Sequence, residues 1–320
     1  MKILIVCSGN APDHQVFDVK LHHAFIYEQV SELEKSGISF DYFYIKGKGA
    51  YGYIKSILRL RKKIKSKDFD IIHSHYGLSG LVATFQRKLP VVATFHGCDV
   101  NRKSLNILSS FVGIFSRANI FVSEDLKNRI FVKTPYKNFV IPCGIDLKQF
   151  RLLDKQEART KLNLDDSKKY ILFSSTKNIP VKNWSLARQA TDQYPYIELL
   201  ELSEKTREEV NLMMNASDLF LMTSLREGSP QTIKEAMACN CPVVSTDVGD
   251  VRWVTGGTAG CYVSGYDVTD VAEKIQKALE FVQTKGRTNG RERIIELGLD
   301  SETIAGKIIE VYKKVLKIND

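Results

Sequence analysis

The densest group of residues that could do chemistry lies in the second half of the chain, after a short apolar segment. Glu227 and Glu235 are separated by seven residues, which begin with Gly228, Ser229 and Pro230. A serine before a proline is a common helix start, so we expect Ser229 as the N-cap and Pro230 as the first helical residue. The amides at such a helix start, together with the helix dipole, favour a bound phosphate. Glu235 would then lie in the second turn.

A second group consists of histidines at the ends of two predicted strands. His73 and His75 end one apolar segment, and His96 follows the next. Open parallel sheets present functional side chains at the carboxyl ends of their strands. The spacing of His73 and His75 would suit a zinc pair, but no third ligand accompanies them. The six cysteines form no CxxC pair, so we expect reduced thiols and no metal site.

Apolar, β-branched segments alternate with amphipathic stretches of helical length along the whole chain. The expected strands are residues 2–6, 39–45, 69–73, 91–95, 119–123, 139–142, 170–174, 197–200, 218–222, 242–246 and 261–263. This alternation predicts an α/β fold with parallel sheets covered on both faces. It is interrupted once, at 143–168, so we expect doubly wound domains at 1–150 and 151–300, followed by a last helix at 301–317.

Positive charge is concentrated in the first of these domains. The chain carries 46 Lys and Arg against 37 Asp and Glu, a net charge of +9. Residues 1–150 have a net charge of +10, so the surplus lies entirely in that half. A basic domain favours an anionic partner, which could be a membrane surface, a nucleic acid or a phosphorylated substrate.

The segment 51–67 is the most basic part of that domain, with seven positive residues and no acidic one. Its apolar residues, which we expect to form a buried stripe, are Ile54, Ile57, Leu58 and Ile64. The segment is either an ordinary crossover helix with a solvated basic face or a patch that binds an anionic membrane surface. The sequence leaves both interpretations open.

The sequence shows no sign of export or of a membrane span. No apolar segment approaches the ~20 residues that would span a bilayer. The apolar start is too short for a signal peptide and is followed by no cleavage site. We therefore expect a cytoplasmic protein, with a peripheral position on the inner membrane if the basic segment binds lipid.

The stretch from Glu227 to Gly249, EGSPQTIKEAMACNCPVVSTDVG, resembles the signature of the retaining family-4 glycosyltransferases, which have the GT-B fold. Five further segments are similar to motifs of that family and occur in its order, namely 70–77 (DIIHSHYG), 94–99 (TFHGCD), 119–126 (NIFVSEDL), 140–150 (VIPCGIDLKQF) and 177–183 (KNIPVKN). The resemblance implies two facing Rossmann-like domains with a cleft between them. It also implies that residues 301–320 cross back to the first domain.

The resemblance also implies roles for particular residues. Lys182 corresponds to the family's phosphate-binding lysine. Lys177 stands where the family usually has an arginine, so a compact ammonium replaces a planar guanidinium with several fixed donors. Glu235 would accept hydrogen bonds from the donor's ribose. Glu227 and, from the first domain, His96 would face the donor sugar, so the catalytic set is His96, Glu227 and Lys182. The other implied donor-binding residues are Gly228, Ser229, Pro230, Gln231, Thr232 and Gly9.

The implied reaction is transfer, with retention, from a nucleotide-sugar to an acceptor hydroxyl in the synthesis of a surface polysaccharide, glycolipid or other glycan. A UDP-sugar is preferred over a GDP- or ADP-sugar, and no metal is required because lysines and a helix start can neutralise the diphosphate. The partners would be the nucleotide-sugar, a glycan or lipid-linked acceptor, and an anionic membrane surface. Asp250 follows Gly249 and the family's usual glutamate is absent from this loop, which leaves the donor sugar open.

Two other functions remain as alternatives. A non-hydrolysing nucleotide-sugar epimerase can share this two-domain architecture, and product analysis without an acceptor would separate it from a transferase. A nucleic-acid-binding protein would fit the basic half, but the sequence contains no helix-turn-helix, zinc knuckle or RNP-type aromatic pattern. We therefore expect no nucleic-acid partner.

Overall fold

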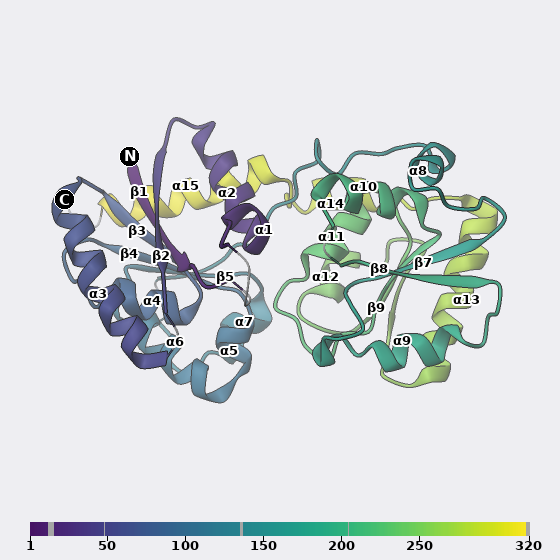
Figure 1. The fold of residues 1–320 in the computed structure, drawn as a ribbon, viewed down its shortest axis with the longest axis horizontal. Helices are drawn as coiled ribbons and strands as arrows, with labels where there is room; N and C mark the ends of the chain where they lie inside the picture. The colour runs from purple at the N-terminus through teal and green to yellow at the C-terminus, as the bar shows by residue number, and fades with distance from the viewer. Residues whose placement is uncertain (12–15, 48, 135–136, 204, 318–320) are drawn as a thin grey trace. The chain divides into compact units, whose positions relative to one another are not determined.

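The structure is a computed structural model of the 320-residue chain, and it describes residues 1–11, 16–47, 49–134, 137–203 and 205–317. The chain separates into two compact units, which are coloured by residue number in Figure 1. The first unit comprises Met1–Gly144 and Ser301–Asp320, and the second comprises Ile145–Asp300. The chain therefore enters the second unit after Gly144, whereas the sequence placed the boundary at residue 150.

The first unit contains a six-stranded sheet in the order β2-β1-β3-β4-β5-β6. Its strands are β1 (Lys2–Ser8), β2 (Ser39–Ile45), β3 (Ile71–His75), β4 (Val91–Phe95), β5 (Ala118–Phe121) and β6 (Asn138–Val140). All neighbouring pairs are parallel. Every residue of β3, β4 and β5 is buried, as expected for strands that have helices on both faces.

The helices of the first unit are α1 (Val19–His22), α2 (Ala24–Glu34), α3 (Gly49–Ser66), α4 (Gly77–Thr84), α5 (Cys98–Asn101), α6 (Lys103–Phe115), α7 (Glu124–Arg129) and α15 (Ser301–Lys317). Helix α15 packs against α2, although the two are far apart in sequence (Figure 1). The last helix predicted at 301–317 is present, and it has a buried apolar stripe of Ile304, Ile308, Tyr312 and Val315.

The second unit contains a five-stranded parallel sheet in the order β11-β10-β9-β7-β8. Its strands are β7 (Lys169–Phe173), β8 (Ile197–Glu201), β9 (Leu219–Met222), β10 (Val243–Thr246) and β11 (Cys261–Ser264). Its helices are α8 (Lys155–Lys161), the 3-10 turn η2 (Pro180–Lys182), α9 (Trp184–Thr191), α10 (Arg207–Ala216), α11 (Gln231–Ala238), α12 (Val251–Thr255), α13 (Val268–Lys285) and α14 (Gly290–Glu296). The predicted class, with two Rossmann-like α/β units, is confirmed.

The buried stripe predicted for α3 is wrong at two of its four positions. Ile54 and Leu58 are 60% and 63% exposed, whereas Leu60 and Ile64 are buried and Ile57 is partly buried. The helical repeat explains the difference, because residues four apart share a face and Ile54 and Leu58 lie on the side opposite Leu60. Helix α3 therefore carries apolar side chains on its outer face as well as on its inner face.

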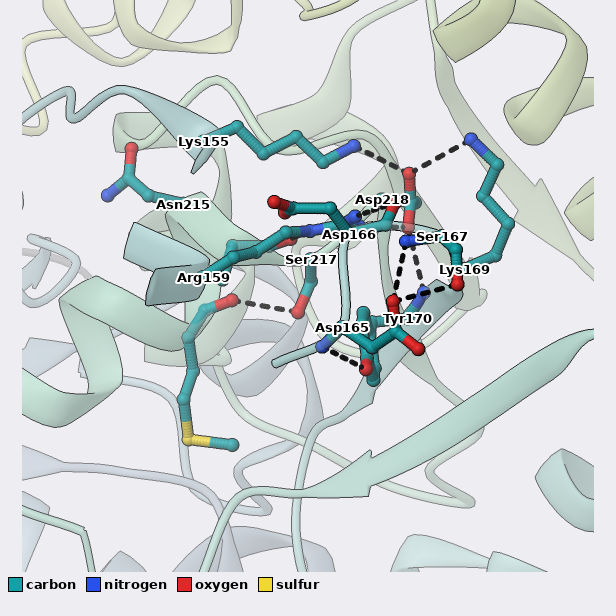
Figure 2. Close-up of polar contacts among 12 residues, drawn as sticks. Lys155, Arg159, Asp165, Asp166, Ser167, Lys169, Tyr170, Asn215, Ser217 and Asp218 are labelled. Carbon is teal, nitrogen blue, oxygen red and sulfur yellow. Dashed lines mark hydrogen bonds and ion pairs between the residues drawn. The ribbon is translucent and has the colours of Figure 1, made fainter. Parts of the chain in front are cut away.

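A buried carboxylate fixes α8 to the start of two strands of the second unit. Asp218 has a fully buried side chain and lies 2.8 Å from Arg159 and 2.6 Å from Lys155, both on α8. It also accepts a 2.7 Å hydrogen bond from the amide of Tyr170 in β7, and Figure 2 shows this convergence. Burial alone would raise the pKa of Asp218, but the hydrogen bond and charge of Lys155 hold that pKa below its ordinary value.

We predict that Asp218→Ala lowers the free energy of unfolding by about 3–5 kcal/mol, because it leaves the buried Arg159 without its carboxylate. The native pKa of Asp218 is depressed, so its contribution is present above the unfolded-state pKa of 3.8 and is lost as the pH falls below that value. Urea unfolding at pH 7 and at lower pH should show the two proteins converging on acidification. Asp192→Ala, which removes an exposed ion pair with Arg188, should change stability by less than about 0.5 kcal/mol.

Candidate functional site

Two loops of the second unit are tied together at the carboxyl edge of its sheet. One follows β7 and includes η2, and the other follows β9. The hydroxyl of Thr223 donates to the carbonyl oxygens of Lys182 and Asn183, at 3.1 and 2.9 Å. The amide of Leu225 donates to the carbonyl of Val181 at 2.8 Å. These bonds fix the backbone on both sides of Lys182 against the loop that leads to α11.

The side chains of Lys182 and Glu227 meet at this junction. Lys182 Nζ lies 2.7 Å from Glu227 Oε1, and the two side chains are 23% and 17% exposed. The structure thus brings together two of the three residues predicted as catalytic. Lys177 lies on the same loop as Lys182 and is exposed, and its amide donates to Glu201 Oε2 at 3.0 Å. An anion at this position could compete with Glu227 for the lysine.

The loop that follows β10 packs tightly on the Glu227 loop. Gly249 has φ +58°, in the left-handed region, and a Cβ at this position would lie 2.6 Å from the carbonyl oxygen of Gly228. Gly228 itself is buried. This close approach requires glycine at position 249 and holds the backbone that carries Glu227.

The predicted helix start is displaced by one residue. Helix α11 begins at Gln231 with Pro230 as its N-cap residue, so Ser229 is not the N-cap and Pro230 is not the first helical residue. The hydroxyl of Ser229 is used elsewhere: it donates to Asp250 Oδ2 at 2.5 Å and accepts from Lys234 Nζ at 2.7 Å. Pro230, the N-cap residue, makes no side-chain capping bond to α11, and Gln231 and Thr232 in its first turn are partly exposed. The start of such a helix favours a bound anion.

Lys234 and Asp250 are site residues that the sequence analysis missed. Lys234 is fully buried, and its ammonium also donates to Gln231 Oε1 at 3.3 Å. Asp250 is 7% exposed, and burial raises its pKa against the opposing effects of the Lys234 charge and the Ser229 hydrogen bond. Every residue from Ile233 to Ala238 is buried, so helical periodicity could not have distinguished this lysine from a solvated one.

Glu235 is buried, and only one of its two carboxylate oxygens has a polar partner within the described part of the chain. Its Oε1 lies 2.8 Å from Arg207, whose guanidinium stacks over the ring of Phe150 at 4.6 Å. Its Oε2 is buried and has no hydrogen-bond partner within the described part of the chain. An unsatisfied buried carboxylate oxygen is costly, so this atom is suited to accept a hydrogen bond from a bound ligand.

His96 lies at the carboxyl end of β4 in the first unit. Its Nε2 is 3.0 Å from Nδ1 of the buried His75, and its Nδ1 is 3.9 Å from Cys143 Sγ. The carboxylate of Asp99 accepts from the amides of His96 and Gly97, at 3.1 and 2.8 Å, which fixes the turn after the strand. Burial lowers the pKa of His96 to about 3, so its ring is neutral at pH 7.

His73 and Gly9 have structural partners in the same unit. The two ring nitrogens of His73 lie 2.6 Å from the Tyr312 hydroxyl and 2.7 Å from that of Thr94, so this histidine links α15 to the sheet. The amide of Gly9 donates to Ile45 at 2.8 Å, and a Cβ on Gly9 would lie 2.5 Å from that of Tyr44. Packing alone therefore requires glycine at position 9, and its donor-binding role stays a prediction.

Among the described residues, no group of three or more His, Cys, Asp or Glu side chains is arranged to hold a metal ion. None of the helices described is both long enough and apolar enough to cross a membrane. None of the six cysteines, all of which lie in the described part of the chain, forms a disulfide.

Two sequence families match the chain in succession. The family described as Glycosyltransferase Family 4 matches residues 18–149, and the family described as Glycosyl transferases group 1 matches residues 181–280. D-inositol 3-phosphate glycosyltransferase from Mycobacterium marinum is 25% identical over 276 residues, which cover 71% of this chain and 59% of that protein. The UDP-Gal:alpha-D-GlcNAc-diphosphoundecaprenol alpha-1,3-galactosyltransferase of Escherichia coli is 24% identical over 241 residues, which cover 61% of this chain and 62% of that protein.

The chain thus spans about three fifths of the length of these relatives. Among solved structures, that of Anabaena HepE in complex with UDP-glucose is similar with a TM-score of 0.79 and 16% identity, over 98% of this chain and 100% of that one. This likeness confirms the predicted fold.

We predict that Lys234→Met lowers the free energy of unfolding by about 3 kcal/mol, because it removes the buried cation that Ser229 and Asp250 face. Adding Asp250→Asn should restore part of the loss, since the buried carboxylate then no longer needs a cation. Denaturant unfolding of both variants measures this coupling. Lys277→Met, at an exposed position on α13, should be close to neutral; a similar loss in both lysine variants would contradict the assignment.

Proposed function

The chain belongs to the family-4 glycosyltransferases and has the GT-B fold, and from this we propose that it transfers a sugar from a nucleotide-sugar donor to an acceptor hydroxyl. The observation that carries the proposal is the Lys182–Glu227 pair at the junction of two loops, one of which leads to the start of α11. A cation, a carboxylate and a helix N-terminus at one sheet edge can bind a diphosphate and act on the group attached to it.

The second unit would bind the donor. Lys182 and the first amides of α11 hold the diphosphate, with Lys177 as a second cation on the same loop. The uncommitted Oε2 of Glu235 accepts a hydrogen bond from a ribose hydroxyl. The UDP-glucose complex of the similar HepE structure supports a UDP-sugar donor in preference to a GDP- or ADP-sugar. We propose that these groups neutralise the leaving diphosphate without a metal ion.

The transfer would proceed with retention of configuration on one face of the sugar. The bond between the anomeric carbon and the diphosphate oxygen breaks, and the acceptor oxygen forms its bond on the same face. The acceptor proton passes to the departing phosphate. Glu227 would act at the sugar, and the role expected for His96 stays a prediction. Stabilisation of the charge that develops on the diphosphate would be the largest contribution to the rate.

For the acceptor, we propose a glycan or lipid-linked hydroxyl compound at the cytoplasmic face of the inner membrane, used in polysaccharide or glycolipid synthesis. The name of the Escherichia coli relative gives a lipid-linked acceptor, and that of the Mycobacterium marinum relative gives a phosphorylated polyol. The basic first unit is suited to either, since both carry phosphate.

The proposal is tested by incubating purified protein with a panel of nucleotide-sugars, with and without candidate acceptors. Release of nucleoside diphosphate that depends on the acceptor, together with a product that keeps the donor's anomeric configuration, would support it. Conversion of the nucleotide-sugar into its epimer without any acceptor would instead identify an epimerase, and stable binding to oligonucleotides without turnover would overturn the enzyme assignment.

We predict that substitutions in the second unit separate binding from transfer. Lys182→Ala removes a charged hydrogen-bond donor that contributes about 1.5–3 kcal/mol, so UDP affinity should fall roughly ten- to a hundredfold. Glu235→Ala should weaken UDP binding with a smaller effect on turnover of the saturated enzyme. Glu227→Gln should abolish transfer yet bind UDP at least as tightly, because Lys182 loses its competing carboxylate.

Calorimetry with UDP and the transfer rate of each variant check these effects, with Lys277→Ala, an exposed lysine on α13, as the matched control. Transfer at the parental rate by Glu227→Gln would show that the family membership fixes the fold of this chain but not its chemistry.

A further inference from the structure

Three helices of the first unit, α3, α4 and α6, form one layer on one face of its sheet. Helix α4 packs against both α3 and α6, and Figure 1 shows the three in succession. The connections from β2 to β3, from β3 to β4 and from β4 to β5 all run in the same direction across the sheet. Right-handed crossovers therefore place these helices on the same face.

This layer exposes an unusual number of apolar side chains. On α3, Tyr51, Ile54 and Leu58 are 77%, 60% and 63% exposed. A second group, which we term the aromatic patch, lies on α6 and beside it and consists of Phe85, Ile107, Phe111, Ile114, Phe115, Phe131 and Val132.

Three rings of the aromatic patch are in contact with one another. The ring of Phe111 lies 6.0 Å from that of Phe85 and 4.5 Å from that of Phe115. The segment that contains Phe131 and Val132 is hydrogen-bonded to the side chains of α6. Exposed apolar groups in contact with one another indicate an interaction surface.

The three helices contain basic residues and no acidic residue, although Asp41 of β2 forms ion pairs with Lys63 of α3 and with Lys67. Between Asp41 and Glu124 the sequence contains 14 Lys and Arg, and its acidic residues there are Asp68, Asp70 and Asp99. None of the three acids lies in α3, α4 or α6, and Asp99 is buried. A partner of this surface must therefore be anionic as well as apolar.

A recess of about 630 Å³ opens beside the aromatic patch, between the end of α4, the start of β4 and the end of α6. Its cations are Arg87, Lys88, Arg117 and Lys137, its wall includes Ile114 and Phe115, and its described lining residues include no carboxylate. Burial and the charge of Arg117 lower the pKa of Lys137. A bound anion would therefore stabilise the charged form of this lysine.

We propose that this helix layer docks on an anionic lipid bilayer, with a lipid phosphate in the recess and the exposed rings and aliphatic side chains among the acyl chains. Amphipathic surfaces of this kind bind membranes through buried apolar area and attraction to anionic lipid. A soluble polyanion would leave the aromatic rings in water. A second copy, related by a twofold axis, would oppose like charges. Docking requires neither donor nor acceptor, so it is independent of the proposed transfer reaction.

The test is co-sedimentation of the full chain with phosphatidylglycerol–phosphatidylcholine vesicles and with phosphatidylcholine vesicles, without nucleotide. Binding should require phosphatidylglycerol and weaken steeply with salt. Each cation near the surface contributes about 1 kcal/mol, or about fivefold, so reversing Lys88 and Arg117 to Glu should weaken binding at least tenfold. Phe111→Ser with Phe115→Ser should do the same at unchanged charge.

The matched controls lie in the second unit. Ile295→Ser removes an apolar side chain that is 53% exposed, as Phe115 is, and Lys277→Glu reverses an exposed lysine. Both should bind vesicles as the parent does, and thermal unfolding should show that every variant is folded. A blue shift for Phe115→Trp on anionic vesicles would support insertion of the patch.

Several results would overturn the proposal. Equal binding to both kinds of vesicle, or parental binding by the Phe111→Ser, Phe115→Ser variant, would exclude the aromatic patch. Binding to heparin that is as tight as binding to vesicles and unaffected by the phenylalanine substitutions would assign the surface to a soluble polyanion. A concentration-dependent dimer that these substitutions abolish would assign it to a second copy of the chain.

Discussion

The ion pair between Lys182 and Glu227 is the interaction around which the candidate site is built. A parallel sheet delivers the loops after all its strands to one edge, which is why residues 45 positions apart in sequence come within 2.7 Å of each other. The hydrogen bonds of Thr223 and the close approach of Gly249 fix the two loops. In the proposed reaction a diphosphate replaces one carboxylate as the partner of Lys182, so the resting ion pair keeps the lysine oriented and the donor exchanges one anion for another.

The two units use charge in different ways. In the second unit, buried charged groups have polar partners: Asp218 pairs with the buried Arg159, Glu235 pairs with the partly exposed Arg207, and Lys234 faces Ser229 and Asp250. Burial makes each of these groups depend on its partner, which favours one arrangement of the loops. In the first unit, His73 and His75 are buried and His96 is neutral, whereas the cations of α3 lie on the helix layer. The buried charged groups of the second unit are thus suited to bind a polar ligand, whereas the exposed cations of the first unit are suited to attract an anionic surface.

Much of the fold could be predicted from the sequence because parallel strands and the stripe of α15 follow from burial of apolar residues. Lys182 and Glu227 could also be predicted as site residues, but only because several motifs of the chain resemble those of a known family. Predictions from local sequence patterns were wrong where contacts with other parts of the fold determine what a side chain does. Ser229 was predicted to cap α11, but its hydroxyl is hydrogen-bonded to Asp250 and Lys234 instead. Ile54 and Leu58 resemble core residues, yet the surface on which they lie has no covering element within the described chain.

The most direct measurement of the central claim is a crystal structure of the protein grown with UDP. We predict that the diphosphate oxygens lie within hydrogen-bonding distance of Lys182 Nζ and of the first amides of α11. Lys182 should no longer contact Glu227, and a ribose hydroxyl should donate to Glu235 Oε2. A diphosphate bound away from α11, with the Lys182–Glu227 pair still intact, would contradict this prediction.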